Sequence, residues 1–341
     1  MKNVTNIKNG EVTPAPLMQM VNGAWLAKTL TVAAELDIFT IIAESGPLGV
    51  EEIAEKVKIQ SRPAEMLLNA CVSLGLLEKE DKKYRNASVT DKFMVKGKPT
   101  YFGDIIIMLG TREYDTWSNL KEAVQANKPV SPDIVGLTAT PESARQFTKA
   151  MHNNAIAPAI ALSSLINFSR FTYLLDLGGG SGAYSIMITK KYPNLKAIVF
   201  DFPYVCEVAQ EYIDKIRASS NVTTRSGNFW MDEFPEDADV VLLGQVLHSF
   251  SEKKNRILLQ KIHDYLPKGG MLIITEFLLN QDKTGPVFAT LFGLNMLTAS
   301  QDGKTYTGKE IRQLLQGAGF VDIKSQVPLS GPHSVIYGIK Q

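Results

Sequence analysis

The chain has 341 residues, of which 45% are hydrophobic and 21% are charged, and its formal net charge at pH 7 is +1. This length exceeds one typical domain, and the composition excludes a disordered chain. The nearly balanced charge excludes a general electrostatic attraction to nucleic acid or to an acidic membrane surface.

The N-terminus and the cysteines indicate a cytoplasmic protein. Residues 1–15 are polar and predict a loose leader rather than a signal peptide, and nowhere do about 18 apolar residues follow one another without a charge. Cys71 and Cys206 each lie in an apolar periodic segment, which predicts buried thiols rather than a disulfide or a metal pair. We therefore expect a reducing compartment and no contact with a membrane.

Residues 16–100 carry the pattern of a small helical domain. Residues 16–36 form a helix that is apolar around much of its circumference, and at an N-terminus such a helix is commonly buried against a second subunit. Short helices then precede a charged turn at 78–84 and a small β-wing at 85–89, which together resemble a winged helix. The expected recognition helix offers only Arg62 to a phosphate and is otherwise mostly apolar, which favours a dimerisation domain over DNA binding.

Residues 101–165 continue as helices that link this domain to the next. Phe147 and Met151 lie four residues apart in one of these helices and therefore share a face. Two interpretations of this face stay open: it belongs to the core, or it faces a ligand. His152 follows directly and is a further candidate for lining such a pocket.

The period of the apolar residues changes from Thr172 onward. Strand patterns lie at 173–177, 196–200, 221–225, 239–243, 271–275 and 333–339. Because helical stretches separate most of these strands, residues 166–341 predict an α/β domain with a doubly wound, mostly parallel Rossmann-like sheet. In such a sheet, ligands bind beyond the carboxyl ends of the strands.

The first of these strands ends in Asp176 and runs into a glycine loop that contains Gly178 and Gly180. Glycines at this spacing fit both a dinucleotide and S-adenosylmethionine. The carboxylate of Asp176 would face a pyrophosphate badly, and it suits a ligand with a positively charged ammonium or sulfonium group. Asp201 ends the next strand, at the spacing where an acid accepts hydrogen bonds from both hydroxyls of a ribose. Together the two acids favour S-adenosylmethionine.

Asn228 and Phe229 follow the third strand. An asparagine carbonyl accepts a hydrogen bond from an adenine amino group, and an aromatic ring stacks on the base. The alternative is a turn with a buried aromatic side chain. Their register with Asp176 and Asp201 favours contact with adenine.

His248 lies just past the fourth strand, and Glu276 lies at the end of the fifth. Adjacent strand ends converge on one crevice, so Glu276 is placed to hold the imidazole of His248 in the tautomer that accepts a proton. This pair is a candidate general base with its orienting acid, although a lone histidine is more often structural and such a carboxylate is often solvated or caps a helix. No metal-ligand spacing links the histidines, so we expect no metal site.

These motifs resemble those of the S-adenosylmethionine-dependent O-methyltransferases of the plant caffeic-acid and hydroxyindole (acetylserotonin) class, from about Pro16 onward. The matching segments are 176–182, 199–203, 246–248, 266–270, Glu276, 285–297 and 318–320. The segment 285–297 is most similar to the hydroxyindole branch.

The resemblance implies methyl transfer to a hydroxyl of a small, aromatic or polyketide-like metabolite. It also implies a homodimer, in which an intertwined N-terminal domain helps to close the partner's pocket. The implied cofactor-binding residues are Asp176, Gly178, Gly180, Asp201, Asn228 and Phe229. The implied substrate-binding residues are Phe147, Met151, Asn295 and Met296, and the implied catalytic residues are the base His248 and the acid Glu276.

The chain departs from the family pattern at three positions. Ser249 and Thr305 stand where many relatives carry acids, and Asn228 replaces an aspartate. The first two changes reduce the negative field around His248, so Glu276 becomes its dominant partner. Two other functions therefore stay open: an enzyme of this fold that methylates N or C or does not methylate, and a DNA-binding dimer that senses S-adenosylmethionine.

Overall fold

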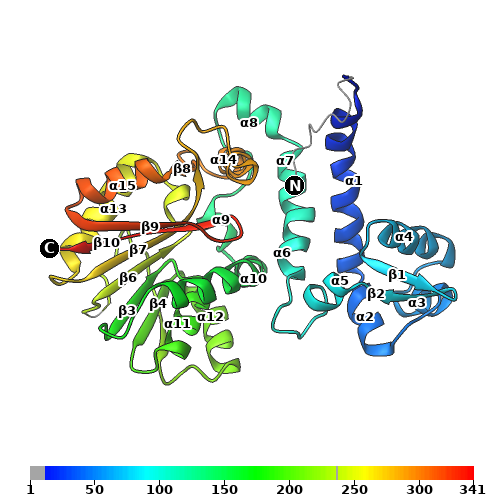
Figure 1. Cartoon of the computed structure of the whole chain (residues 1–341), viewed down its shortest axis with the longest axis horizontal. Helices are drawn as coiled ribbons and strands as arrows, with labels where there is room; N and C mark the ends of the chain where they lie inside the picture. Colours follow the sequence, from blue (N-terminus) through cyan, green and yellow to red (C-terminus); the bar gives the residue numbers. More distant parts are fainter. Residues whose placement is uncertain (1–11, 236) are drawn as a thin grey trace. The chain divides into compact units, whose positions relative to one another are not determined.

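The computed structural model describes residues 12–235 and 237–341 (Figure 1). Residues 1–11, the larger part of the expected leader, lie outside the described residues. The chain divides into two compact units, Met1–Tyr114 and Asp115–Gln341. The division falls within the predicted linking segment 101–165.

The first unit is helical and carries one β-hairpin. Its elements are α1 (Ala15–Glu35), α2 (Ile38–Ser45), α3 (Val50–Lys56), α4 (Ser61–Ser73), β1 (Leu77–Glu80), β2 (Lys83–Asn86), α5 (Ser88–Phe93), α6 (Gly103–Met108) and a π-helical turn (Leu109–Glu113). The side chains of Ile38, Phe39, Ile53, Leu68 and Tyr84 are buried in its core. The short helices followed by the hairpin β1–β2 form the predicted winged-helix pattern.

The wing lies earlier in the chain than the sequence pattern predicted. Strands β1 and β2 pair antiparallel from Leu77 opposite Asn86 to Glu80 opposite Lys83. Asp81 and Lys82 both take left-handed backbone conformations, with φ of 48° and 65°, as the turn of a tight hairpin requires. The segment predicted as a charged turn therefore forms most of the hairpin, and helix α5 begins at Ser88.

Helix α1 presents large apolar side chains on the surface of the single chain. The exposed ones in its first half are Leu17, Met18, Met20, Val21, Trp25 and Leu26. Only Thr31, Ala33 and Ala34, near its C-terminal end, are buried. Several large exposed apolar side chains on one helix are typical of a subunit interface.

The second unit contains the predicted α/β sheet. Its strands are β3 (Tyr173–Leu177), β4 (Lys196–Asp201), β5 (Val222–Ser226), β6 (Val240–Gly244), β7 (Met271–Leu279), β8 (Tyr306–Thr307), β9 (Phe320–Ser330) and β10 (His333–Lys340). The order across the sheet is β5-β4-β3-β6-β7-β10-β9, and β8 pairs with β7. Strands β3 to β7 are parallel, and β10 and β9 are antiparallel additions. The six predicted strands and the mostly parallel sheet are confirmed.

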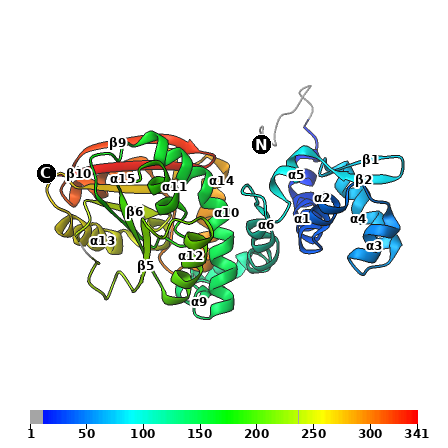
Figure 2. The ribbon, with the colours of Figure 1, turned by 90° about the horizontal axis from the view of Figure 1, so that it is seen from below.

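The remaining helices are α7 (Tyr114–Trp117), α8 (Leu120–Ala126), α9 (Ile134–Leu137), α10 (Pro141–Leu165), α11 (Ala183–Lys191), α12 (Pro203–Lys215), α13 (Glu252–Tyr265), α14 (Val287–Ala299) and α15 (Gly308–Gly317). Five of them cover the two faces of the sheet. Apolar residues of α10, α11 and α12 pack on one face, and those of α13 and α15 pack on the other (Figure 2). The carboxyl ends of β3, β4, β6 and β7 therefore come together at one edge.

In the part of the chain that the structure describes, no helix combines the length and the apolar character needed to cross a bilayer.

Candidate active site

The glycine loop between β3 and α11 takes a conformation that other residues avoid. Gly178, Gly180 and Gly182 have φ of 66°, 56° and 72°. A Cβ at Gly178 would also lie 3.1 Å from a methyl of Val246 and 3.8 Å from the ring of Phe229. The loop therefore brings the end of β3 against two segments that follow later strands.

Asp176 lies fully buried beneath this loop. Its Oδ2 accepts a hydrogen bond from Ser185 Oγ at 2.7 Å, and within the described residues its Oδ1 has no partner. Burial raises the pKa of Asp176 to about 7, against the effect of the Ser185 bond. A Cβ on Gly179 would lie 2.7 Å from the carboxyl carbon, so the loop closes directly over this acid.

Asp201 is half-buried at the end of β4, beside the same loop. Its Oδ2 accepts from the Gly180 N–H at 2.9 Å, and its Oδ1 accepts from the Phe202 N–H at 2.7 Å. Burial raises the pKa of Asp201 to about 6, and these backbone bonds oppose the rise. The carboxylate is held rigidly, and each oxygen keeps a lone pair for a further donor.

Asn228 and Phe229 lie in a short turn after β5. The Oδ1 of Asn228 accepts from the Trp230 N–H at 2.9 Å, so one lone pair of this oxygen is left for a ligand. Phe229 is half-buried, and its ring centroid lies 5.3 Å from that of Trp230 and 6.0 Å from that of Phe250. Phe229 lies close to the glycine loop, since its ring would be 3.8 Å from a Cβ at Gly178.

His248 and Glu276 are both buried and in direct contact. His248 lies in a 3₁₀ turn (Leu247–Ser249) after β6, and Glu276 lies in β7. The imidazole Nδ1 is 2.9 Å from Oε2 and 3.2 Å from Oε1, and the main-chain N–H of His248 donates to Oε1 at 3.1 Å. A carboxylate accepts hydrogen bonds, so in the neutral imidazole Nδ1 carries the proton and Nε2 has the free lone pair. The predicted pairing is therefore present in the structure.

Phe292 is a neighbour of His248 that the sequence motifs did not indicate. The two ring centroids are 4.8 Å apart at an interplanar angle of 90°. Phe292 lies three residues before Asn295 in α14 and so near the same helix face, which is the signal that would have identified it. Asn295 is half-buried and Met296 is buried.

Trp117 fixes the orientation of the Asn295 side chain. Its indole Nε1, which is only a donor, donates to Asn295 Oδ1 at 2.7 Å. The amide group of Asn295 is thereby left as a pair of N–H donors.

Helix α10 carries Phe147 and Met151, both half-buried. Their neighbour His152 is buried, with Nδ1 2.8 Å from Ser181 Oγ of the glycine loop. Its ring stacks on Tyr212 at 3.7 Å between centroids, and burial lowers its pKa to about 4. His152 therefore anchors α10 to the glycine loop as a neutral imidazole.

Comparison with known proteins agrees with this geometry. The model of the O-methyltransferase domain matches residues 117–321, and that of the O-methyltransferase dimerisation domain matches residues 18–96. The chain belongs to the O-methyltransferase family. It is therefore an S-adenosylmethionine-dependent methyltransferase, as the sequence motifs predicted.

Individual relatives of this O-methyltransferase match it over nearly the whole chain. It is 34% identical over 334 residues to 3-hydroxy-5-methyl-1-naphthoate 3-O-methyltransferase of Streptomyces sahachiroi, covering 96% of this chain and 95% of the relative. It is 31% identical over 331 residues to the tetracenomycin polyketide synthesis 8-O-methyl transferase of Streptomyces glaucescens, covering 96% of this chain and 97% of that relative. The crystal structure of human N-acetylserotonin methyltransferase in complex with S-adenosylmethionine superposes with a TM-score of 0.89 at 28% identity, covering 98% of this chain and 99% of the human one.

The residues of this O-methyltransferase fit S-adenosylmethionine. All three loop glycines are left-handed, and a Cβ at Gly180 would have nothing within 4 Å, so the loop is open at this point. The unpaired Oδ1 of Asp176 is a buried acceptor that suits a cationic donor. Asp201 offers fixed carboxylate oxygens. No cluster of three or more potential metal ligands occurs among residues 12–235 and 237–341.

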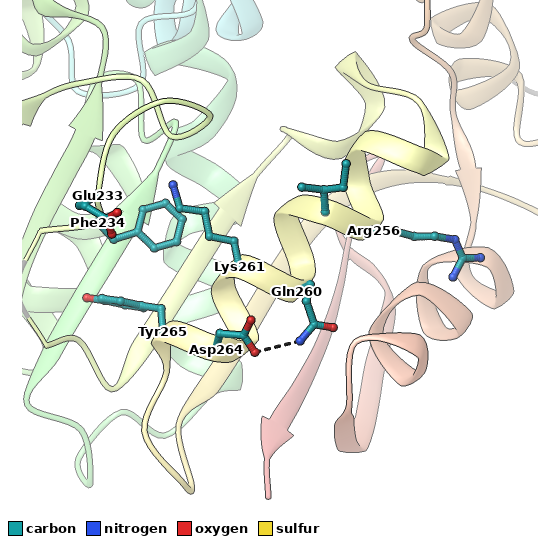
Figure 3. Close-up of a pocket in the computed structure, with 8 residues that line it drawn as sticks. Glu233, Phe234, Arg256, Gln260, Lys261, Asp264 and Tyr265 are labelled. Atoms are coloured by element: carbon teal, nitrogen blue, oxygen red, sulfur yellow. Dashed lines mark hydrogen bonds between the residues drawn. The ribbon is translucent and has the colours of Figure 1, made fainter.

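A cavity of about 660 Å³ lies elsewhere on this O-methyltransferase, along the outer side of α13 (Figure 3). Its lining residues are Glu233, Phe234, Arg256, Ile257, Gln260, Lys261, Asp264 and Tyr265. None of them belongs to the predicted site. Lys261 links the cavity wall to the site, because its Nζ donates to the carbonyls of Phe229 and Asp232 at 2.9 and 2.7 Å.

Proposed function

We propose that this O-methyltransferase methylates a hydroxyl of a small aromatic or polyketide-like metabolite, with His248 as the general base. The observation that carries the proposal is the buried pair of His248 and Glu276 at the sheet edge that also carries the glycine loop. The names of the two Streptomyces relatives, a naphthoate and a tetracenomycin O-methyltransferase, support an aromatic acceptor.

The donor site comprises six residues: Asp176, Gly178, Gly180, Asp201, Asn228 and Phe229. S-adenosylmethionine, when bound, supplies an electrophilic methyl group. The glycines leave room for the ligand, and the carboxylate of Asp201 accepts from the ribose hydroxyls. The remaining lone pair of Asn228 Oδ1 accepts from the adenine amino group, and the ring of Phe229 stacks on the base.

His248 accepts the proton of the acceptor hydroxyl at Nε2, and Glu276 stabilises the imidazolium that forms. General-base catalysis of this kind contributes about 10²- to 10⁴-fold in rate. Correct placement of the acceptor oxygen contributes up to about 7–11 kcal/mol. The main contribution of the chain to catalysis is therefore to hold the acceptor hydroxyl at hydrogen-bonding distance from Nε2 of His248.

The acceptor site comprises Phe147, Met151, Asn295 and Met296, and we add Phe292. Phe292 presents an aromatic surface directly beside His248. The amide N–H groups of Asn295, oriented by Trp117, favour an acceptor that carries a hydrogen-bond-accepting oxygen near the methylated hydroxyl. A hydroxylated aromatic carbonyl compound satisfies both features.

The working form is a homodimer in the cytoplasm. The exposed apolar face of α1 and the match to a dimerisation domain support self-association over DNA binding. Cys71 and Cys206 are both buried free thiols, which agrees with a reducing compartment.

A mass-shift screen tests the reaction. The protein is incubated with methyl-labelled S-adenosylmethionine and a panel of phenols, hydroxyindoles, hydroxynaphthoates and polyketides. We expect a gain of one labelled methyl on an oxygen of at least one aromatic acceptor. Transfer to nitrogen or carbon only, or to none of the acceptors, would overturn the proposed reaction.

The variant His248→Ala tests the base. We expect kcat to fall by about 10²- to 10⁴-fold while the Kd for S-adenosylmethionine stays within about twofold. The matched control is His263→Ala, on α13, which should keep normal activity. Undiminished turnover by His248→Ala would remove His248 from the mechanism.

A further inference from the structure

The segment 247–250, which comprises the 3₁₀ turn that carries His248 and the next residue, Phe250, is held by donors from outside it. The carbonyl oxygens of residues 247, 248, 249 and 250 all accept such a hydrogen bond. The donors, in the order of these carbonyls, are Asn255 Nδ2 at 2.9 Å, Lys304 N at 2.9 Å, Ser300 Oγ at 2.9 Å and Tyr306 OH at 2.8 Å. The main-chain N–H of His248 is bound separately, by Glu276.

Two of these donors form a single buried network. Asn255 in α13 is 0% exposed and Tyr306 in β8 is 1% exposed. Asn255 Nδ2 donates to the Tyr306 hydroxyl at 2.9 Å, and that hydroxyl donates onward to the carbonyl of Phe250. The network therefore holds both ends of segment 247–250. Asn255 binds the carbonyl of Leu247, and Tyr306 binds that of Phe250, which also lies 3.4 Å from Asn255 Nδ2.

The network holds a fixed set of donor and acceptor roles. Because the Tyr306 hydroxyl gives its one proton to Phe250, it must accept from the amide group of Asn255. This arrangement leaves Asn255 Oδ1 without a partner among the described residues, and an unpaired buried acceptor is retained only at a cost in stability. Burial raises the pKa of Tyr306 to about 12, so the hydroxyl remains a donor at neutral and moderately alkaline pH.

The segment that leads to Tyr306 packs closely on the same turn. A Cβ on Gly303 would lie 2.9 Å from the carbonyl oxygen of His248. This neighbour is main chain, so it has no flexible end that could move aside. Ser300 and Lys304 lie in the same segment, which follows directly after helix α14 of the acceptor site.

We infer that Asn255 and Tyr306 are positioning residues for methyl transfer, which hold the main chain of residues 247–250 so that the imidazole of His248 stays in register with the acceptor hydroxyl. The inference rests on the proposed role of His248 as the base. Neither residue needs to touch the donor or the acceptor. Each acts through the placement of His248, where an error of about 1 Å costs up to about 100-fold in rate.

Steady-state kinetics on Tyr306→Phe and Asn255→Leu test this inference. We expect kcat to fall about 10- to 100-fold, with the KM for the acceptor and the Kd for S-adenosylmethionine within about twofold of the unchanged protein. The matched control is Tyr192→Phe, which removes a hydroxyl that donates to the carbonyl of Ile166 at 3.0 Å. Tyr192→Phe should lower Tm by about as much as Tyr306→Phe does, and it should leave kcat unchanged. A kcat loss no larger than that of the control would overturn the inference.

A double-mutant cycle separates a positioning role from a general loss of stability. If Tyr306 acts through His248, Tyr306→Phe costs little further rate in the His248→Ala background, measured by slow transfer of labelled methyl. Equal losses in both backgrounds would show that Tyr306 acts independently of His248. That result would overturn this inference and leave the proposed role of His248 intact. Full activity of His248→Ala would overturn the proposed base and the inference with it.

A third variant tests the turn without removing a buried hydrogen bond. Gly303→Ala presses a methyl group against the carbonyl of His248, and we expect the same pattern of reduced kcat with unchanged donor Kd. The matched control is Gly317→Ala in α15, where an added Cβ would lie 3.2 Å from Nη1 of Arg256, the end of a flexible side chain. If Gly303→Ala and Gly317→Ala are equally active, the turn tolerates displacement and the inference is wrong.

Discussion

Glu276 binds His248 at two places at once. Its carboxylate accepts from the imidazole Nδ1 at 2.9 Å and from the main-chain N–H of the same residue at 3.1 Å. One acid therefore sets both the tautomer of the ring and the position of the backbone that carries it. Ser249 and Thr305 stand where many relatives carry acids. Within the part of the chain that the structure describes, the carboxylate that binds the His248 ring is that of Glu276.

Glu276→Gln should separate these two roles. The amide oxygen can still accept from the main chain, but the amide N–H groups facing Nδ1 favour the tautomer in which Nε2 is protonated and no longer a base. We expect kcat to fall by about 10²- to 10⁴-fold with a normal Kd for S-adenosylmethionine, measured by labelled-methyl transfer and calorimetry. Glu252→Gln, an exposed carboxylate on α13, serves as the control. Normal turnover by Glu276→Gln would show that the tautomer is set by another group.

Donor binding should weaken as the pH falls. The pKa values of Asp176 and Asp201 are raised to about 7 and about 6, chiefly by burial, so both acids gain protons between pH 8 and pH 5. A protonated Asp201 no longer accepts two ribose hydroxyls, and a protonated Asp176 no longer attracts a cation. We expect the Kd for S-adenosylmethionine to rise as pH falls, by up to about tenfold per pH unit between 7 and 6, where Asp176 gains its proton, and by up to about 100-fold per pH unit below 6, where both acids do.

Titration calorimetry from pH 8 to pH 5 checks this dependence. Asp201→Asn is the informative variant, since it should bind weakly at pH 8 and keep only the part of the pH dependence that Asp176 causes, up to about tenfold in Kd per pH unit below 7. A Kd that is constant across this range in the unchanged protein would contradict charged carboxylates as donor ligands.

Asp176→Asn should stabilise the protein in the absence of the donor. The folded chain holds a proton on Asp176 up to about pH 7, while the ordinary value of 3.8 applies when the chain unfolds. The resulting cost to stability is absent at very low pH, grows as the pH rises and is complete above about 7. We expect Tm to rise by about a few °C at pH 8 and by less at pH 5, together with weaker donor binding.

Thermal unfolding at both pH values measures this effect. Asp214→Asn is the control, because Asp214 is exposed and its pKa is lowered by hydrogen bonds from Ser219 and Gln210. That variant should show no gain in Tm. A loss of Tm in Asp176→Asn at pH 8 would mean that the buried carboxylate stabilises the fold.

The sequence predicted those parts of the molecule that local periodicity and strand ends determine. The parallel strands apart from β5 are largely apolar runs. Asp176, Asp201 and Glu276 lie in the C-terminal halves of their strands and His248 follows β6, so sheet topology alone brings them together. Strand β9 was not predicted because it is an edge strand with mostly exposed side chains, including Asp322 and Lys324, and so lacks an apolar alternation. The wing was misplaced because its turn uses Asp81 and Lys82 instead of the expected glycine or asparagine.

The parts of the site that depend on distant pairs could not be predicted. Trp117 and Asn295 are 178 positions apart, and His152 and Ser181 are 29 apart. Neither pair has a spacing rule, because packing of separate helices and loops creates the contact. Phe292 could have been found, since it shares a helix with Asn295.

Lys261 should support donor binding from outside the donor site. Its Nζ donates to two carbonyls of the turn that carries Asn228 and Phe229, and lies 4.4 Å from the ring centroid of Phe234. Lys261→Met keeps the aliphatic chain and removes the donors, so we expect the turn to loosen and the Kd for S-adenosylmethionine to rise about tenfold. Lys253→Met, an exposed lysine on the same helix, is the control. Equal Kd values for both variants would show that the turn keeps its conformation without the hydrogen bonds from Lys261.

Trp117 should determine how well the acceptor is held. Trp117→Phe keeps an aromatic ring and removes the indole N–H that donates to Asn295 Oδ1, so the Asn295 amide can rotate and present its oxygen to the acceptor. We expect the KM for an aromatic carbonyl acceptor to rise about 3- to 10-fold, the value of one hydrogen bond, with the Kd for S-adenosylmethionine unchanged. Steady-state kinetics on Trp117→Phe, Asn295→Ala and the double variant measure the coupling. Because Trp117 acts through Asn295, its loss should add little once Asn295 is alanine, and additive losses would place Trp117 in direct contact with the acceptor instead.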